Sequence, residues 1–377
     1  MSRRKPNRKH RVGVFTTPIG KPSLIPVSNL MCILTSITDD ISIISANEIL
    51  SLIKKSNISH YSVLSHTTGN SPFFRILNFL FLQIKISYFF LKYNKYVDYW
   101  FFFLGGEVYV IPIILSRLLH KPIICILASS VSQFYLFDRY QFVLKSFSTI
   151  GYFFADKIIL YSSKLIPEWK LGKYSEKIII AQRHFLDFTT FTITTPYKDR
   201  YPLIGYIGRL SGEKGVLHFT EALPAILNRH KDLRCLIGGD GQLKDSIESS
   251  LHDNDISIRV DLPGWISHDE LPHYLNQLRL LIIPSYTEGL PNIMLEAMAC
   301  GTPVLATPVG AIPDVLIDGD TGFIMENNSP ECITKNVIRA LNSPDLFVIA
   351  EKGRRYVEKN FSFENALVIW KNVLEKI

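Results

Sequence analysis

Cysteine is scarce in this chain, and its few copies are scattered. Neither a C-x-x-C pair nor a Cys/His group occurs among Cys32, Cys125, Cys235, Cys300 and Cys332. Zinc sites need closely spaced ligands, and small disulfide scaffolds need many paired cysteines. The sequence therefore argues against both classes and is typical of a protein in the reducing cytosol.

A long apolar run without charge is also missing. The most apolar stretch, residues 73–93, carries Arg75, Lys85 and Lys92, whereas a spanning helix needs about 20 apolar residues with few or no charges. Two interpretations remain for this stretch, an interfacial helix at headgroup level and a buried crossover helix. The apolar run at residues 12–15 is too short for a signal peptide and predicts the first strand.

The composition predicts a folded chain with two domains. A hydrophobic fraction of 47% with 20% charged residues excludes wholesale disorder. A chain of 377 residues also exceeds one ordinary core. Most of the net charge of +7 comes from a basic tail, which is either a lipid- or nucleic-acid-binding arm or a solvated one. This tail holds Arg3, Arg4, Lys5, Arg8, Lys9 and Arg11.

Short apolar runs alternate with helical stretches along the whole chain, which predicts parallel α/β sheets. The strands predicted in the first half are residues 12–15, 41–44, 99–103, 123–127, 158–161 and 178–181. Those predicted in the second half are residues 203–207, 233–237, 258–262, 280–283 and 304–307. The intervening stretch of Thr, Pro and charged residues predicts a linker at 187–202 between domains 1–186 and 203–360.

The stretch at residues 280–307 organises the second domain. It predicts a strand, a loop and a helix, which Pro291 and Gly301 bracket in the order that helices favour. The N–H groups that begin this helix would face the carboxyl edge of a parallel sheet, where α/β folds bind anions. Glu288 lies on the loop and Glu296 lies in the helix between two apolar rows, so Glu296 needs a partner such as a ligand hydroxyl. The alternative is that Glu288 is a first-turn charge favoured by the helix dipole and that Glu296 is an ordinary solvated helix residue.

A second loop has the composition of a diphosphate site. Residues 208–215, GRLSGEKG, follow a predicted strand and precede a helix, so they combine backbone donors with two cations, Arg209 and Lys214. The loop is not a P-loop, because G-x-x-x-x-G-K-[ST] is not met. The glycine-rich turn GGDG at residues 238–241 follows the next strand and is weak evidence by itself.

Glu288, Gly289, Leu290, Pro291 and Glu296 resemble the E-x7-E element of retaining glycosyltransferase family 4, the glycosyl transferases group 1. That family includes sucrose synthase and many bacterial and archaeal lipid and polysaccharide glycosyltransferases. The resemblance runs from about residue 205 to residue 322, and the N-terminal half matches in layout alone. It implies the α/β fold called GT-B, in which two Rossmann-like doubly wound domains face each other across a cleft. A C-terminal helix at 361–377 would pack back on the first domain.

The resemblance also implies the site residues of a hexosyltransferase that acts with retention on a nucleotide-diphosphate sugar. Arg209 and Lys214 would bind the diphosphate and Glu288 the sugar hydroxyls, which makes these three the catalytic candidates. Glu296 would hold the ribose, and Trp265 would line the base pocket unless it belongs to the core. The other donor-binding candidates are Gly208, Gly239, Gly241, Gly289, Leu290, Pro291 and Asn292.

No metal or other cofactor is expected. Asp318 and Asp320 have D-x-D spacing, but they match a turn of the family and have no supporting His or carboxylate nearby in the sequence. Arg209, Lys214 and the helix start at Pro291 would stabilise the leaving diphosphate where Mg²⁺ does so elsewhere.

The first domain departs from the family pattern. Gly20 stands alone at residues 16–23, where many members have a glycine-rich loop, and residues 128–130 lack the family's His. Gly105 and Gly106, followed by Glu107, are the substitute candidates on the acceptor side. The isolated His66, His120 and His184 are expected to be structural.

The first domain selects the acceptor in this family, and here it holds both the basic tail and the aromatic segment 73–93. We therefore expect a glycan or lipid-linked acceptor in cell-envelope glycan biosynthesis. The enzyme would be cytoplasmic, with peripheral contact to the anionic cytoplasmic face of the membrane and no nucleic-acid partner.

Three other function classes remain open. A nucleotide-sugar epimerase of similar architecture would need a base in the first domain and no acceptor. A dinucleotide-dependent oxidoreductase is disfavoured, because no G-x-G-x-x-G follows any predicted strand of the second domain. A non-catalytic scaffold would bind no nucleotide diphosphate.

Overall fold

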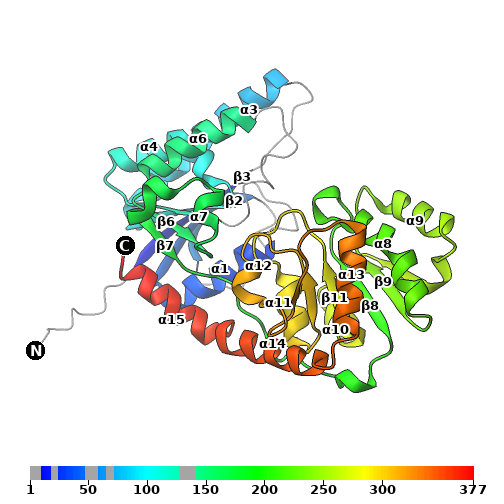
Figure 1. The fold of residues 1–377 in the computed structure, drawn as a ribbon. Helices are drawn as coiled ribbons and strands as arrows, with labels where there is room; N and C mark the ends of the chain where they lie inside the picture. The colour runs from blue at the N-terminus through cyan, green and yellow to red at the C-terminus, as the bar shows by residue number, and fades with distance from the viewer. Residues whose placement is uncertain (1–9, 18–23, 47–57, 65–71, 128–140) are drawn as a thin grey trace, which may run out of the picture. The chain divides into compact units, whose positions relative to one another are not determined.

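The structure is a computed structural model that describes residues 10–17, 24–46, 58–64, 72–127 and 141–377. The chain divides into two compact units (Figure 1). Unit 1 comprises Met1–His184 and Ala366–Ile377, and unit 2 comprises Phe185–Asn365. The segment 187–202, which the sequence predicts to be a linker, lies within unit 2. There the buried Arg200 donates hydrogen bonds to the carbonyl oxygens of Leu278 (2.9 Å) and Cys300 (2.7 Å), which ties the segment to the unit.

Unit 1 is built on a parallel sheet whose strand order, in the described residues, is β3-β2-β1-β4-β5-β6-β7. The strands are β1 (Arg11–Thr16), β2 (Asp40–Ala46), β3 (Ile58–Leu64), β4 (Tyr99–Phe103), β5 (Ile123–Ile126), β6 (Lys157–Leu160) and β7 (Ile178–Ile180). The sequence pattern predicts all of them except β3, where Ser and His interrupt the apolar residues. The chain leaves β1 for β2 on one side and later returns to β4 on the other, so the topological switch point lies between β1 and β4.

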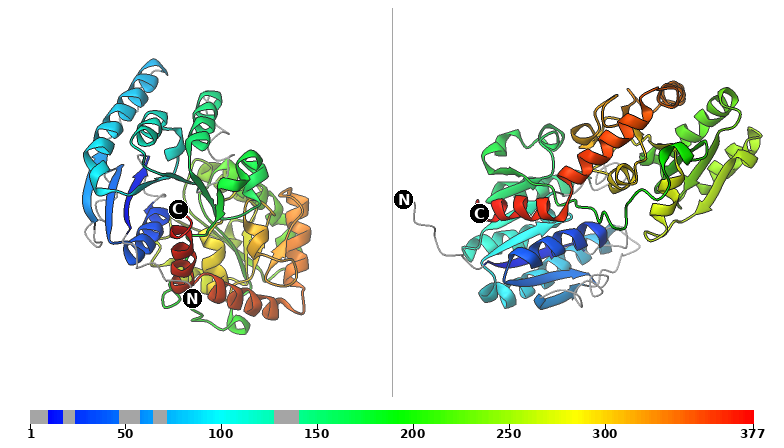
Figure 2. Two further views of the ribbon diagram at one scale, coloured as in Figure 1. Left: turned by 90° about the vertical axis from the view of Figure 1, so that its left-hand side faces the viewer. Right: turned by 90° about the horizontal axis from the view of Figure 1, so that it is seen from below.

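Helices cover both faces of this sheet (Figures 1 and 2). Trp100 of β4 stacks on Phe90 of helix α3 (Pro72–Tyr93) with ring centroids 4.0 Å apart. The next residue, Phe101, packs on Trp370 of helix α15 (Phe363–Leu374). Because successive strand residues point to opposite faces, α3 and α15 cover opposite faces. One face carries α3 (Pro72–Tyr93), α4 (Val110–Leu118) and α6 (Gln141–Phe154), and the other carries α1 (Leu24–Ile37) and α15 (Phe363–Leu374). The short helix α7 (Leu165–Glu168) follows β6.

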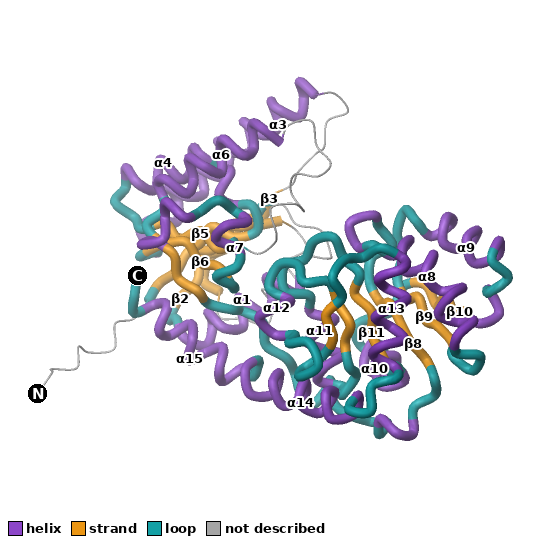
Figure 3. The backbone as a smooth tube through the Cα atoms, viewed as in Figure 1, coloured by secondary structure: helices purple, strands orange, loops and turns teal. Residues whose placement is uncertain are grey.

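Unit 2 repeats this architecture, with its own strands flanked by helices (Figure 3). In the described residues the strand order is β10-β9-β8-β11-β12-β13, and every pair is parallel. The strands are β8 (Leu203–Ile207), β9 (Arg234–Gly238), β10 (Val260–Gly264), β11 (Leu280–Ile283), β12 (Val304–Ala306) and β13 (Phe323–Ile324). The sequence pattern misses β13, because two residues are too few to show a period. Here the switch point lies between β8 and β11.

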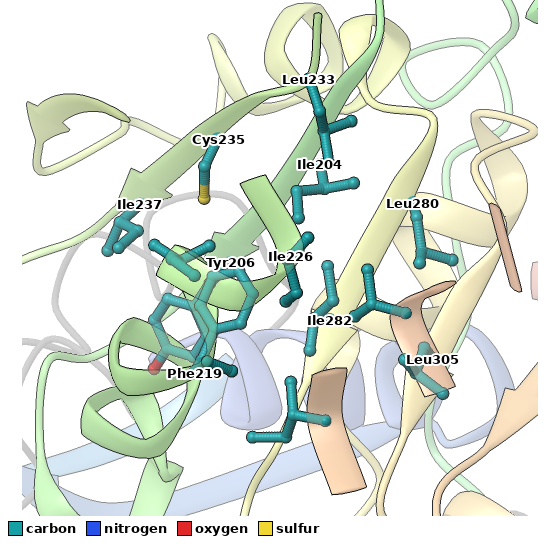
Figure 4. Packing of buried hydrophobic residues seen from close by; sticks show 14 of the residues in the cluster. Ile204, Tyr206, Phe219, Ile226, Leu233, Cys235, Ile237, Leu280, Ile282 and Leu305 are labelled. Atoms are coloured by element: carbon teal, nitrogen blue, oxygen red, sulfur yellow. The ribbon is translucent and has the colours of Figure 1, made fainter. Parts of the chain in front are cut away.

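Apolar side chains from the unit 2 sheet pack against α8 (Val216–Arg229), α9 (Lys244–Asp253) and α13 (Pro330–Leu341) (Figure 4). Ile204 and Ile282, for example, point from β8 and β11 toward Phe219 and Ile226 of α8. The remaining helices are α10 (Leu271–Gln277), α11 (Asn292–Ala299), α12 (Ile312–Val315) and α14 (Leu346–Asn360). This core fixes the strand ends, and the strand ends position the loops that carry the charged residues.

Candidate functional site

The loops after β8, β9 and β10 form one connected backbone layer at the carboxyl edge of the unit 2 sheet. The amide of Gly208 donates to the carbonyl of Gly238 (2.9 Å), and the amide of Gly239 donates to that of Gly264 (2.7 Å). Gly239 has a φ of 137°, and a Cβ there would lie 1.8 Å from the carbonyl oxygen of Gly208. Glycine is therefore required at this position, because the two loops approach too closely for any side chain.

Arg209 extends from the end of β8 with its guanidinium more than half exposed. The Arg209 side chain is 58% exposed, and its Nη1 lies 3.5 Å from the carboxylate of Glu213. The hydroxyl of the buried Tyr206 donates to the backbone carbonyl of Arg209 (2.6 Å), and burial raises the pKa of that hydroxyl, which keeps it protonated. The backbone of Arg209 is thus fixed while its guanidinium remains accessible to an anion.

Lys214 forms an ion pair with Glu288, which links the loop after β8 to the loop after β11. The Nζ of Lys214 lies 2.7 Å from Oε1 of Glu288, and the hydroxyl of Ser285 donates to the same oxygen at 2.7 Å. Glu288 is 6% exposed. The resemblance assigned these two side chains to different parts of the donor, but without a ligand each is the other's partner. A bound diphosphate would have to share Lys214 with Glu288.

Glu296 has a protein partner that the sequence did not predict. Its Oε1 accepts a hydrogen bond from Nε2 of His268 (3.2 Å), and this bond raises the pKa of the His268 imidazole. His268 is held by the turn before α10, where the hydroxyl of Ser267 donates to the Glu270 carboxylate (2.7 Å) and the Glu270 amide donates back to that hydroxyl (3.3 Å). These two hydrogen bonds close the turn in front of α10. Nothing in the sequence spacing pairs His268 with Glu296, because 28 positions separate them.

The loop before α11 presents backbone donors to the same edge. Pro291 is the N-cap residue of α11, and no side chain caps the helix start. The amide of Ala311 donates to the carbonyl of Gly289 (2.9 Å), and a Cβ on Gly310 would lie 2.2 Å from the carbonyl oxygen of Glu288. The segment at Gly310 and Ala311 therefore packs against the backbone of this loop. Asn292 begins α11, and the first N–H groups of this helix can bind an anion.

Trp265 follows β10 and is 75% exposed. That exposure excludes the core interpretation and leaves an aromatic face accessible beyond the strand end. Gly241 lies in the turn after β9. The structure thus brings together, at one edge of unit 2, the loops that carry all the donor-side candidates.

The acceptor-side candidates lie in unit 1, and Gly20 falls outside the described residues. Gly105, with φ 80°, and Gly106 turn the chain after β4 and lead into Glu107. Glu107 is 3% exposed, and its Oε2 has no hydrogen-bond partner in the described part of the chain. Burial raises its pKa from 4.5 to about 7. The sequence offered Glu107 only as a neighbour of two glycines, and its burial could not be read from that turn.

The D-x-D pair is engaged in ion pairs with cations. A carboxylate oxygen of Asp318 lies 2.9 Å from Arg339, and one of Asp320 lies 2.8 Å from Lys352. Across the described residues, no three His, Cys, Asp or Glu side chains are grouped as metal ligands.

Residues 190–360 match the model of the family described as "Glycosyl transferases group 1". The chain is 30% identical over 173 residues to an uncharacterized glycosyltransferase of Methanocaldococcus jannaschii, covering 46% of this chain and 47% of that protein. It is 28% identical over 175 residues to the capsular polysaccharide biosynthesis glycosyltransferase CapM of Staphylococcus aureus, covering 45% of this chain and 44% of CapM. The matches thus span about half the length of these relatives.

The fold matches that of Anabaena HepE in complex with UDP and glucose. The TM-score is 0.77 over 98% of this chain and 100% of HepE, at 16% identity. At that identity the likeness concerns the fold alone. Residues 190–360 therefore belong to the glycosyl transferases group 1, on a chain whose two doubly wound parallel sheets have the GT-B type of α/β fold.

Proposed function

We propose that this protein transfers a hexose from a nucleotide-diphosphate sugar to an acceptor hydroxyl, with retention of configuration at the anomeric carbon. The observation that carries the proposal is the gathering of Arg209, Lys214 and Glu288 beside the β8/β11 switch point. Ligands of open α/β sheets bind outside the carboxyl ends of the strands at such a point. Two cations and the start of α11 suit a diphosphate, and a buried carboxylate suits sugar hydroxyls.

In the proposed reaction the acceptor oxygen forms a bond to the anomeric carbon while the bond from that carbon to the diphosphate oxygen breaks. The diphosphate leaves with the electron pair, and Arg209 and Lys214 stabilise the negative charge that develops on it. The acceptor proton passes to an oxygen of the departing phosphate. Glu288 holds the sugar in position, so positioning and charge stabilisation supply most of the catalysis. These cations take the place of a metal, and activity should therefore persist in EDTA.

A thermal-shift screen over UDP-, GDP- and ADP-sugars tests donor binding. A donor at a hundred times its dissociation constant should stabilise the protein by about 2.7 kcal/mol. Incubation with the matching radiolabelled donor alone separates transfer from the epimerase alternative, because an epimerase yields a new sugar without an acceptor. Failure of every nucleotide sugar to shift the unfolding transition would contradict the proposal.

The proposed acceptor is lipid-linked and is reached at an anionic membrane surface. In the described residues no helix is both long and apolar enough to cross a bilayer. Helix α3, however, buries Phe90 and exposes Phe81, Ile84, Tyr88 and Leu91, each by more than 50%, at alternating spacings of three and four residues. This spacing places them on one helix face. Exposed Lys85 and Lys92 accompany the stripe, and this mixture suits apolar insertion beside anionic headgroups.

Vesicle sedimentation tests this placement. Exchanging Phe81, Ile84 and Leu91 for Ser should release the protein from anionic vesicles, and high salt should release it in part. The matched control is Ile258→Ser, which alters an 83% exposed apolar residue of unit 2 and should leave binding unchanged. Wild-type protein that stays in the supernatant at low salt would indicate a soluble acceptor.

A further inference from the structure

Arg183 is a buried cation at the carboxyl edge of the unit 1 sheet. Its side chain is 4% exposed and lies three residues beyond the end of β7. The guanidinium carbon is 5.2 Å from the ring centre of Phe103, the last residue of β4, and 5.9 Å from that of Tyr161, which follows β6. Arg183 is therefore held at the place where parallel α/β sheets bind ligands, by the ends of three strands.

The charge of Arg183 has no counter-ion in the part of the chain that the structure describes. Its Nε meets no hydrogen-bond acceptor there, and no Asp or Glu forms an ion pair with it. Burial lowers the pKa of the guanidinium to about 10, so it remains a cation at neutral pH. The cation–π contact with the two aromatic rings offsets part of the free energy that the guanidinium loses when it is removed from water. A buried charge that lacks an oxygen partner is nevertheless unfavourable, and an anionic ligand would remove the deficit.

The neighbours of Arg183 keep it in place without neutralising it. Trp370 donates from Nε1 to the carbonyl of Gln182 (3.0 Å), which fixes the backbone next to Arg183. His184 is 5% exposed, and burial lowers the pKa of its imidazole, so it remains neutral beside the guanidinium. The segment thus presents one rigid cation.

We propose that Arg183 binds a phosphate group carried by the acceptor, at the carboxyl edge of the unit 1 sheet. The planar guanidinium can donate two parallel hydrogen bonds to such an oxyanion. A phosphate monoester carries about −1.5 to −2 charges at pH 7, so it compensates a buried cation more fully than a carboxylate does. The assignment to the acceptor rests on the sugar transfer proposed above, whereas the phosphate site itself does not.

Calorimetric titration tests the site without any need for catalysis. The titrated protein is a variant of the whole 377-residue chain with the substitutions Arg209→Ala, Lys214→Ala and Glu288→Gln. These substitutions remove both cations of the diphosphate loop in unit 2. Inorganic phosphate represents a soluble acceptor, and short-chain phosphatidic acid represents a lipid headgroup. We expect binding in at least one arm, and the tighter arm identifies the source of the phosphate. Adding Arg183→Met should weaken that binding at least about tenfold, which corresponds to about 1.4 kcal/mol.

Arg117→Met is the matched control, since Arg117 of α4 is an exposed arginine of unit 1 that is paired with Asp156. It should leave phosphate affinity unchanged. If Arg183→Met does not fold, Arg183→Lys decides, because lysine keeps the charge but loses the planar fork. The proposed phosphate site would be wrong if the folded Arg183 variant kept the phosphate affinity unchanged. It would also be wrong if neither inorganic phosphate nor phosphatidic acid bound. Phosphate binding that depends on Arg183 in a protein that transfers no sugar would leave the site standing and remove only its assignment to an acceptor.

Discussion

The carboxyl edges of the two sheets differ in how their buried charges are compensated. In unit 2, Glu288 pairs with Lys214 and Glu296 pairs with His268. In unit 1, Glu107 and Arg183 are both buried. Oε2 of Glu107 and Nε of Arg183 have no hydrogen-bond partner in the described residues. A paired site exists before its ligand arrives, whereas an unpaired buried group costs stability until a ligand supplies the missing charge or hydrogen bond. Under the proposed function, this difference predicts a preformed donor site in unit 2 and an acceptor side in unit 1 that is completed when the acceptor binds.

The largest expected effect concerns how unit 1 is held together. Trp370 is fully buried between Phe101 and the carbonyl of Gln182, so Trp370→Ala should lower the stability of unit 1 by about 3–5 kcal/mol. Val368→Ala is the control, because Val368 on the same helix is 57% exposed. Hydrogen exchange should show lost protection in β4 and β7 and none lost in unit 2. Unchanged protection in unit 1 would show that the last helix does not support that sheet.

The next effect tests the unpaired carboxyl. The pKa of Glu107 is raised from 4.5 to about 7, so the folded state holds a proton that the unfolded state releases between these values. Stability is then fully present below pH 4.5 and falls by up to about 3 kcal/mol as the pH rises through 7. Glu107→Gln should remove this loss in urea unfolding at pH 5 and pH 8, whereas the exposed Glu168→Gln should not. A wild-type stability that does not fall over this range would refute the burial argument.

A smaller effect tests the paired side. Removing one partner of a buried ion pair costs about 3–5 kcal/mol, and the 20% exposure of Lys214 reduces the expectation for Lys214→Ala to about 2 kcal/mol. Lys214→Ala/Glu288→Gln should recover most of that stability without recovering activity. Thermal unfolding and turnover measured on the same samples separate the two roles. If the double variant is no more stable than Lys214→Ala, the stability lost with Lys214 does not come from its ion pair with Glu288.

Sequence reasoning predicted unit 2 better than unit 1 for a physical reason. The unit 2 site depends on short segments, GRLSGEKG and the E-x7-E helix, whose local turn and helix chemistry is visible in the order of residues. The His268–Glu296 and Lys214–Glu288 pairs join distant positions, so no spacing reveals them. In unit 1 the turn at Gly105 is locally readable, but the burial of Glu107 and Arg183 depends on α6, α15 and the strand ends. For segment 73–93, the packing shows that α3 buries Phe90 on one face and exposes apolar side chains such as Phe81 and Ile84 on another. Contact of the exposed face with a membrane stays a proposal.

The rate of sugar transfer after removal of the accessible cation tests the central claim most directly. Radiolabelled sugar released from the nucleotide donor to the acceptor is followed in Arg209→Ala and in Arg229→Ala, which alters an exposed arginine at the far end of α8. Loss of one charge-stabilising donor costs about 2.7–4 kcal/mol, so Arg209→Ala should transfer on the order of a hundredfold to a thousandfold more slowly while remaining folded. Arg229→Ala should match the wild type. Equal rates in the two variants would contradict the assignment of the β8 loop to the leaving diphosphate.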